Sequence, residues 1–398
     1  MIKDEYIEEA KDSVTIVTLF KDLYPDSKLQ KCGSRYRCRC VFHADTNPSL
    51  YLEPVTNLAH CFGCNKTFDV IGLVRERMNF SFPQAVEYLL KTYGRVGDLQ
   101  DIYEKVSDED TKTEKIKESQ LAVMQFVQEF YTKEYASDSI YAKTCRDYAE
   151  KRLDNPDGRW DSERVLTFGF GYAPASGHAL VDWACRKGLK LDMLVDVGVA
   201  SYYVDSKGRK RYCDLFKDRL TIPQRNRWGQ VIAYTARRLS DIDSCEAKYM
   251  NSKCSDGNLI YKKDRTIFGI DVAGRYARQE KVLFLMEGAP DVIGLYTLGV
   301  YNAVASNGGS WSPYQLEKLK LFTDKICFVP DSDVEMVEVD GAEVRRGESF
   351  VFRSAAIALS LGFKITVKEI PGKQGVKNDV DSYFKTRELW LNTEEEDF

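Results

Sequence analysis

Residues 282–306 read VLFLMEGAPDVIGLYTLGVYNAVAS, and this stretch decides the fold class of the C-terminal part of the chain. An apolar run of strand length is followed by Glu287, then by a helical pattern, and then by a second apolar run. Two further apolar runs, KICFVP from residue 325 and KITVKEIP from residue 364, alternate with helical patterns in the same way. Apolar strands separated by helices predict a mainly parallel sheet that is covered on both faces.

Carboxylates follow the ends of three of these predicted strands. The candidates are Glu287 and Asp291 after the first strand, Asp331 and Asp333 after the third, and Asp379 and Asp381 after the fourth. Because the carboxyl ends of neighbouring parallel strands meet at one edge, we expect these side chains to converge. Clustered carboxylates repel one another unless cations neutralise them, and hard oxygen ligands select Mg²⁺ or Mn²⁺. About two or three such ions there would support nucleotidyl transfer, although each carboxylate taken singly is more typical of a loop residue or helix cap.

Two short ligand pairs, Cys40-Val-Phe-His43 and Cys61-Phe-Gly-Cys64, lie seventeen residues apart in the N-terminal part of the chain. A two-residue spacer lets both side chains of a pair reach one ion, and three thiolates with one imidazole form the tetrahedral site that zinc prefers. Four protein ligands leave no open position, so we expect one structural zinc ion. The nearby Cys32, Cys38 and His60 leave the choice of ligands open, although His60 would point away from its neighbour along a strand.

The composition excludes several classes of protein. With 398 residues, 43% of them hydrophobic, the chain can build cores for two or three domains. No apolar run approaches the ~20 residues that span a bilayer, and the acidic start is unlike a signal peptide, so we expect a cytoplasmic protein with no membrane partner. Five of the 11 cysteines fall between residues 32 and 64, which in a reducing compartment favours metal binding over disulfides.

Basic residues are concentrated locally, although the net charge of the chain is -4. The segment KLQKCGSRYRCRC, residues 28–40, carries Arg35, Arg37 and Arg39 beside an aromatic residue. Cations interleaved with aromatic rings suit single-stranded nucleic acid, through phosphate neutralisation and base stacking. We therefore predict that these three arginines bind DNA.

Several of these stretches resemble one family. Residues 40–74, CVFHADTNPSLYLEPVTNLAHCFGCNKTFDVIGLV, are similar to the zinc-binding domain of bacterial DnaG-type primases. The ordered carboxylates resemble the TOPRIM domain that primases, topoisomerases and some nucleases share. Residues 219–252, RLTIPQRNRWGQVIAYTARRLSDIDSCEAKYMNS, resemble the primase segment that precedes TOPRIM.

The resemblance implies both a fold and a set of roles. The fold is a multidomain α+β and α/β chain with a zinc ribbon, an α+β primase core subdomain and a TOPRIM α/β domain whose sheet is mainly parallel. Residues that would contact template or incoming triphosphate are Arg219, Arg237, Arg238, Lys248 and Asn251, with surface salt bridging as the alternative for any one arginine. Glu287, Asp331 and Asp333 would bind the catalytic magnesium ions, assisted by Asp379, Asp381 and Asp291.

The expected domain organisation follows from these segments. We expect a zinc-binding domain over 1–97, a linker over 98–118 that forms at most a transient helix, a core subdomain over 119–277, a TOPRIM domain over 278–385 and an acidic tail over 386–398. Residues 334–349, VEMVEVDGAEVRRGES, are longer than the family's turn and indicate a hairpin insertion. The family's trailing helices have no counterpart in this sequence, which is typical of a compact phage or mobile-element form.

The predicted function is that of a DNA primase, which makes RNA primers from nucleoside triphosphates on a single-stranded DNA template during replication. A replicative helicase and a single-stranded DNA-binding protein are further candidate partners. One alternative is a TOPRIM nuclease or strand-breaking enzyme, and another is a non-catalytic single-stranded DNA-binding replication protein. The intact acidic set favours an enzyme, because clustered carboxylates without cations are costly.

Overall fold

The computed structural model describes residues 2–64, 66–94, 108–153, 167–239, 247–332, 336–339, 342–370 and 380–398. The chain divides into two compact units, Met1–Lys112 and Thr113–Phe398. Among the described residues, none of the helices combines the length and the apolar character that crossing a membrane would require.

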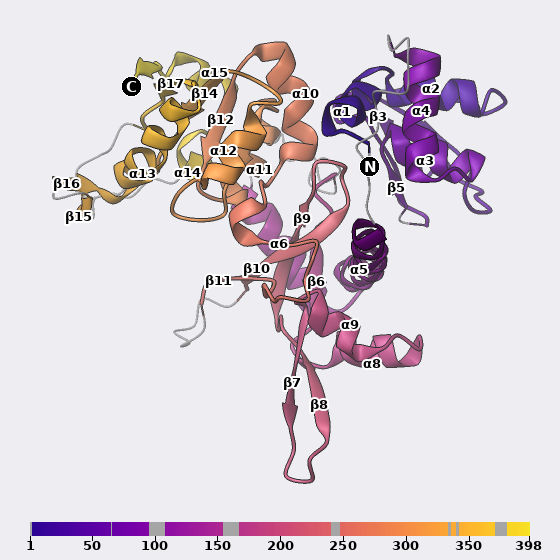
Figure 1. Ribbon diagram of the computed structural model, residues 1–398. Helices are drawn as coiled ribbons and strands as arrows, with labels where there is room; N and C mark the ends of the chain where they lie inside the picture. The colour runs from indigo at the N-terminus through magenta and orange to yellow at the C-terminus, as the bar shows by residue number, and fades with distance from the viewer. Residues whose placement is uncertain are drawn as a thin grey trace. The chain divides into compact units, whose positions relative to one another are not determined.

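The first unit is an antiparallel sheet covered by helices (Figure 1). The strands are β1 (Gln30–Cys32), β2 (Arg35–Cys38), β3 (Leu50–Glu53), β4 (Leu58–Cys61) and β5 (Thr67–Phe68), paired in chain order. The helices are α1 (Asp4–Asp12), α2 (Ile16–Leu23), α3 (Val70–Met78) and α4 (Phe82–Tyr93). Alternate strand residues such as Leu50, Leu52 and Ala59 are fully buried, whereas Tyr51 and His60 between them are partly exposed. The sheet therefore has one core face and one outer face.

The second unit begins with two helices and an antiparallel sheet. The helices are α5 (Asp108–Tyr135), whose first five residues belong to the first unit, and α6 (Ile140–Leu153). The sheet has the order β11 (Tyr249–Asn251), β10 (Val231–Arg238), β9 (Arg219–Arg225), β6 (Gly171–Ala173). Helices α8 (Ala179–Arg186) and α9 (Leu191–Asp196) precede a separate hairpin, β7 (Ala200–Val204) and β8 (Lys210–Asp214). Residues 108–118, expected in the linker, form the start of α5.

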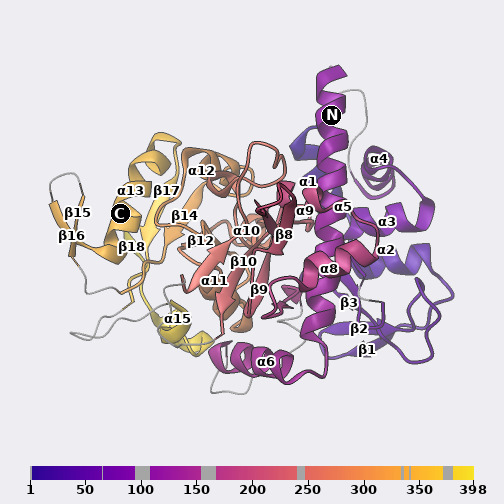
Figure 2. The same cartoon turned by 90° about the horizontal axis from the view of Figure 1, so that it is seen from below.

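The C-terminal part is the predicted sheet of parallel strands. Its order is β13 (Ala303–Ala305), β12 (Leu283–Met286), β14 (Lys325–Phe328), β17 (Lys364–Val367), β18 (Glu396–Asp397), and the first four strands are parallel. Helices α10 (Ile270–Glu280), α12 (Pro313–Leu319) and α13 (Arg346–Ser360) pack on one face. Helix α11 (Ala289–Thr297), with the short helices α14 (Val380–Tyr383) and α15 (Arg387–Asn392), packs on the other face (Figure 2). The residues between β14 and α13 include the expected hairpin, β15 (Met336–Val339) and β16 (Ala342–Arg345).

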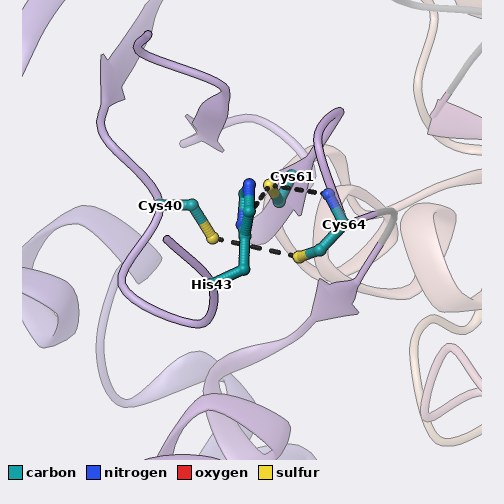
Figure 3. A group of neighbouring side chains, drawn as sticks. All are labelled: Cys40, His43, Cys61 and Cys64. Carbon is teal, nitrogen blue, oxygen red and sulfur yellow. Dashed lines mark hydrogen bonds between the residues drawn. The ribbon is translucent and has the colours of Figure 1, made fainter. Parts of the chain in front are cut away.

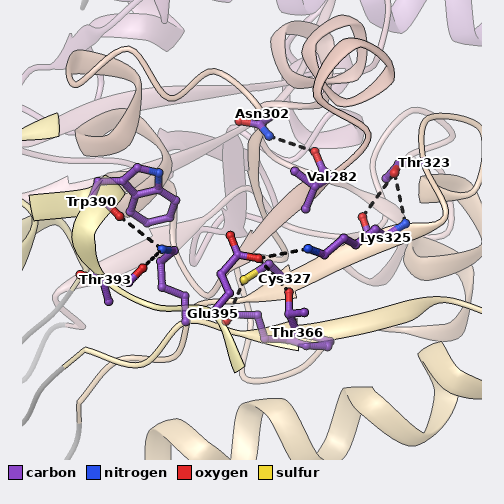
Figure 4. A network of polar contacts seen from close by, with 11 residues as sticks. Val282, Asn302, Thr323, Lys325, Cys327, Thr366, Trp390, Thr393 and Glu395 are labelled. Carbon is purple, nitrogen blue, oxygen red and sulfur yellow. Dashed lines mark hydrogen bonds and ion pairs between the residues drawn. The ribbon is translucent and has the colours of Figure 1, made fainter. Parts of the chain in front are cut away.

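The C-terminal residues, expected as an acidic tail, contain regular structure. They form α15 and then β18, which pairs antiparallel with β17. Lys368 donates hydrogen bonds from Nζ to the carbonyl oxygens of Trp390 and Thr393, and the carboxylate of Glu395 accepts from Lys325 and Thr366 at 3.3 and 3.2 Å (Figure 4). The acidic segment therefore has regular structure, and its residues Glu394 to Asp397 remain exposed to solvent.

Candidate functional site

Four ligand atoms meet in the first unit. The Sγ atoms of Cys40, Cys61 and Cys64 and a ring nitrogen of His43 all lie within 4.8 Å of one another (Figure 3). The two Sγ atoms of Cys40 and Cys64 are 3.9 Å apart, and Cys61 Sγ is 3.8 Å from His43 Nδ1. A tetrahedron with Zn–S bonds of ~2.3 Å has edges of about 3.8 Å. The separations and the donor set therefore fit one zinc ion.

The backbone around these cysteines favours thiolates. The N–H of Phe42 points at Cys40 Sγ and that of Cys64 at Cys61 Sγ, each at 3.4 Å. Burial nevertheless raises the pKa of Cys40 to about 12, so that thiol would stay protonated at neutral pH unless a cation offsets the burial. The alternative ligands are not among the four grouped atoms: Cys32 is exposed, Cys38 is buried, and His60 Nδ1 is 2.7 Å from Thr67 Oγ1.

The first unit is called the zinc unit from here on. The outer face of its sheet carries a row of cationic and aromatic residues. Arg37, Tyr51 and His60 are successive cross-strand partners on β2, β3 and β4. Phe62, which is 39% exposed, contacts the rings of Tyr51 and His60 at centroid distances of 5.2 and 4.6 Å. The predicted DNA contacts on this unit did not include Tyr51 and His60. Both alternate with buried residues along their strands, and this pattern could have marked them as residues of the outer face.

The three N-terminal arginines therefore differ in their surroundings. Arg39 is exposed and Arg37 is partly exposed. Arg35 is buried and forms an ion pair with Glu53 across the sheet. The expectation that Arg35 contacts DNA is corrected, because its guanidinium is used inside the fold.

Two acidic candidates lie at the same edge of the parallel sheet. Glu287 directly follows β12, and Asp331 follows the neighbouring strand β14, with Leu285 of β12 opposite Phe328 of β14. The carboxylate Oδ1 of Asp331 accepts a hydrogen bond of 3.3 Å from the backbone N–H of Val380, the first residue of α14. The backbone of Asp381, the next residue, is thereby brought beside Asp331.

Among the other acidic candidates, Asp291 is the one whose side chain lies in the described part of the chain. Asp333 and Asp379 lie outside the described residues, and for Asp381 only the backbone is described. Asp291 is buried, and its Oδ2 accepts a hydrogen bond of 3.2 Å from the N–H of Gly288 in a capping box of α11. This contact holds the turn that follows Glu287.

Sequence reasoning missed three residues that shape this edge. Asn307, at a positive φ of 53°, accepts a hydrogen bond of 3.1 Å at Oδ1 from the N–H of Ala289. Lys263 reaches the same loop, because its Cε would lie 3.9 Å from a Cβ on Gly308. A Cβ on Gly347, in the first turn of α13, would lie only 1.8 Å from the carbonyl oxygen of Asp331, so the helix can approach Asp331 only with glycine there. The turn sequence SNGGS and the glycine in RRGES were the available signals.

Two of the central arginines are structural. Arg219 is 1% exposed and donates from Nη1 to the carbonyl oxygens of Ala236, Ala247 and Lys248, at 3.3, 3.0 and 3.3 Å. Arg237 is also buried, with its guanidinium 5.3 Å from the ring centroid of Tyr148. The expectation that these two contact DNA or nucleotide is corrected, because each guanidinium stabilises the antiparallel sheet instead.

The remaining central candidates stay closer to the surface. Arg238 is partly exposed and Lys248 is exposed. Asn251, also partly exposed, accepts a hydrogen bond of 2.7 Å at Oδ1 from the hydroxyl of Thr235. These three therefore remain available as candidates for phosphate or base contacts.

Three family models match successive parts of the chain. They are described as the CHC2 zinc finger over residues 2–104, the DNA primase catalytic core, N-terminal domain, over 130–274, and Toprim-like over 284–384.

The similar curated proteins and the similar solved structures are also primases. The chain is 30% identical over 333 residues to the DNA primase of Thermotoga maritima, a match that covers 84% of this chain and 53% of that protein. The crystal structure of the Aquifex aeolicus primase, comprising its zinc binding and RNA polymerase domains, is 27% identical with a TM-score of 0.62, covering 98% of this chain and 86% of that chain.

A third similar protein is the RNA polymerase domain of Mycobacterium tuberculosis primase DnaG, solved in complex with a double-stranded DNA oligomer with a 6-nucleotide overhang. It is 27% identical with a TM-score of 0.54, covering 69% of this chain and 80% of that chain. The chain spans about half the length of the curated relatives it matches, 53% for the first of them. Nothing in these matches bears on a phage or mobile-element origin. Zinc ribbon, catalytic core and Toprim-like domain follow one another as in these primases, and the chain therefore belongs to the DnaG-type primase family.

Proposed function

We propose that this chain is a DNA primase that synthesises short RNA primers on a single-stranded DNA template. The observation that carries the proposal is the edge of the parallel sheet, where Glu287, Asp331 and the start of α14 converge. Such an edge gathers carboxylates from separate segments, which is the arrangement that divalent-cation chemistry needs. The position of this edge in a chain with a zinc ribbon supports the choice of a primase over other Toprim-like enzymes.

Magnesium or manganese fits the donor chemistry of this edge, since its candidate ligands are carboxylate oxygens. Glu287, Asp331 and Asp333 would hold the ions, with Asp379 and Asp381 assisting. Bound there, about two or three divalent cations would supply the positive charge that offsets the reacting phosphates.

The reaction joins two nucleotides. The 3′-hydroxyl oxygen of one forms a bond to the α-phosphorus of the next, the bond from that phosphorus to the bridging oxygen breaks, pyrophosphate leaves, and the hydroxyl proton passes to solvent. Asp291 and Asn307 act here as positioning residues, because both hold the turn that begins at Glu287.

The template and nucleotides would be held by surfaces outside the acidic edge. Arg37, Arg39 and the aromatic row beside them would bind single-stranded DNA on the zinc unit, where Cys40, His43, Cys61 and Cys64 would hold one structural zinc ion. Lys248, Arg238 and Asn251 would contact the template or the triphosphate. The Mycobacterium tuberculosis relative, solved with DNA, supports a DNA partner.

The proposed domain limits are those expected from the sequence: 1–97 for the zinc-binding domain, 119–277 for the core subdomain and 278–385 for the TOPRIM domain. A replicative helicase or a single-stranded DNA-binding protein remains a proposed partner.

Replacement of Asp331 tests the function directly. We expect Asp331→Asn to lower the incorporation of labelled ribonucleotides on single-stranded DNA by at least about 100-fold, because several kcal/mol of charge stabilisation depend on the carboxylate. The matched control is Asp324→Asn, whose carboxylate is 82% exposed in the same domain. Unchanged synthesis by a folded Asp331→Asn protein would contradict the proposal.

The alternatives give different results in the same reaction. A nuclease would cleave labelled DNA without ribonucleotides, and the cleavage would depend on Asp331. A non-catalytic protein would bind the strand but neither extend nor cut it with either cation.

A further inference from the structure

The β7–β8 hairpin stands apart from both sheets of the second unit. Among the described residues its two strands pair only with each other, and they run away from the body of that unit (Figure 1). Three consecutive large side chains on β7 are exposed: Tyr202 by 46%, Tyr203 by 58% and Val204 by 60%. An isolated two-stranded hairpin is only marginally stable in water, so an arm with aromatic residues exposed on both faces suits contact with another molecule.

The tip of the arm is basic. Residues 205–211 read DSKGRKR, with four cations and one carboxylate, in a chain whose net charge is -4. The carboxylate of Asp205 accepts hydrogen bonds from the backbone N–H groups of Lys207 and Arg209, at 2.9 and 3.0 Å, and Gly208 takes a φ of 74°. The turn is therefore built from specific contacts, and it presents its cations in a set order.

The one acidic residue at the tip does not cancel this charge. Asp205 contacts Arg209 and Arg211 at their Nε atoms, both at 3.0 Å. Within the described part of the chain, these contacts use a single nitrogen of each guanidinium. Each guanidinium therefore keeps further N–H donors that can reach a phosphate.

The aromatic residues alternate with the cations across the hairpin. Tyr203 is the cross-strand partner of Arg211, and Tyr202 is that of Tyr212. Lys210 Nζ lies 4.6 Å from the ring centroid of Tyr202 and 3.2 Å from Oδ1 of Asp192, an exposed ion pair that uses one of the three ammonium donors and leaves the others for a phosphate. Tyr203 contacts no other aromatic ring of the described residues, so its face is open for stacking.

We propose that this hairpin binds single-stranded nucleic acid, by stacking a base on Tyr203 and by pairing Lys207, Arg209 and Lys210 with phosphates. Exposed aromatic rings can stack on the bases of a single strand, and the neighbouring lysine and arginine side chains can neutralise its phosphates. That the strand is the primer template rests on the function proposed above, whereas the binding itself does not.

Binding of the full chain to a fluorescein-labelled oligothymidylate, without nucleotides or magnesium, tests the proposal by fluorescence anisotropy. We expect Tyr203→Ala to weaken binding by about 5-fold or more, and Tyr203→Phe, which keeps the ring, to bind like the wild type. The double variant Lys207→Gln/Lys210→Gln should bind more weakly and lower the slope of log K against log salt by about 1.4.

Matched controls lie on α6 of the same unit. Tyr141→Ala removes a tyrosine that is 63% exposed, and Lys143→Gln/Lys151→Gln removes two exposed lysines. Both controls should bind like the wild type, and all variants should share its thermal unfolding temperature. Wild-type binding by folded Tyr203→Ala, or equal loss in the controls, overturns the proposal.

The binding assay on the hairpin variants and the primase assay can fail independently of each other. If the wild type makes no primer while the hairpin variants lose binding, the proposed function fails and the hairpin site stands. If primers are made but the hairpin variants bind normally, the hairpin site fails alone.

Discussion

Gly63 shows how one absent side chain shapes the metal site. A Cβ at this position would lie 2.7 Å from Nε2 of His43 and 2.8 Å from Cε1, closer than carbon atoms approach. The imidazole would have to move while the three thiols stay in place. The glycine between the second pair of ligands is therefore required by His43 from the first pair.

We expect Gly63→Ala to weaken zinc binding by about 10-fold or more, in the range seen when the surroundings of a metal ligand are disturbed. Zinc transfer to a chromogenic chelator measures the change. Gly257→Ala is the control, because its Cβ would meet only Asp196 Oδ1 at an ordinary 3.7 Å. Equal zinc retention in both variants would show that His43 has room to adjust.

Buried arginines show why residue type alone does not assign a role. Arg35, Arg219 and Arg237 have the same charge as the exposed Arg39, yet each is enclosed by acceptors or rings from other segments of the chain. A guanidinium can be buried when its donors are satisfied. Those acceptors are distant in sequence, so no local pattern reveals them.

At the scale of elements, one buried lysine helps to hold the C-terminal residues 387–398 on the sheet. Lys368 is 4% exposed, and burial lowers its pKa. Its ammonium donates to the carbonyl oxygens at the end of α15, which would otherwise lack helical partners. The lysine, which directly follows β17, thus links the end of that strand to the end of α15.

Replacement of this lysine should destabilise the second unit. We expect Lys368→Met to lower the free energy of unfolding by about 1.5–3 kcal/mol, the usual range for hydrogen bonds to a charged group. Urea unfolding followed by tryptophan fluorescence measures this, since Trp390 contacts the lysine. Lys364→Met, on an exposed position of the same strand, should change stability by less than about 0.5 kcal/mol. Equal effects of the two would argue against this link.

At the scale of the whole molecule, the two compact units should respond separately to loss of zinc. The metal ligands all belong to the unit Met1–Lys112. Because structural zinc contributes folding free energy directly, we expect a strong chelator to lower the unfolding temperature of that unit alone. The transition of Thr113–Phe398 should stay in place.

Differential scanning calorimetry with and without chelator measures both transitions, and restored zinc should return the first to its original temperature. A joint shift of both transitions would show that the units unfold together.

Patterns confined to short stretches of sequence were sufficient to predict the parallel sheet and the candidate zinc ligands of this protein. Alternating apolar strands and helices predicted the parallel sheet, and the pairs Cys40/His43 and Cys61/Cys64 predicted the group of ligands that the structure brings together. These patterns are readable because strand burial and ligand spacing are set by neighbours in sequence.

Only the tertiary structure decided which charged residues serve the fold. It paired Arg35 with Glu53 of the neighbouring strand, enclosed Arg219 in the antiparallel sheet, and turned the acidic C-terminal segment into a helix and an edge strand. In each case the deciding partner is a hydrogen-bonding group brought close by folding. The same charged side chain is stable in solvent or in the interior according to whether such a partner is present.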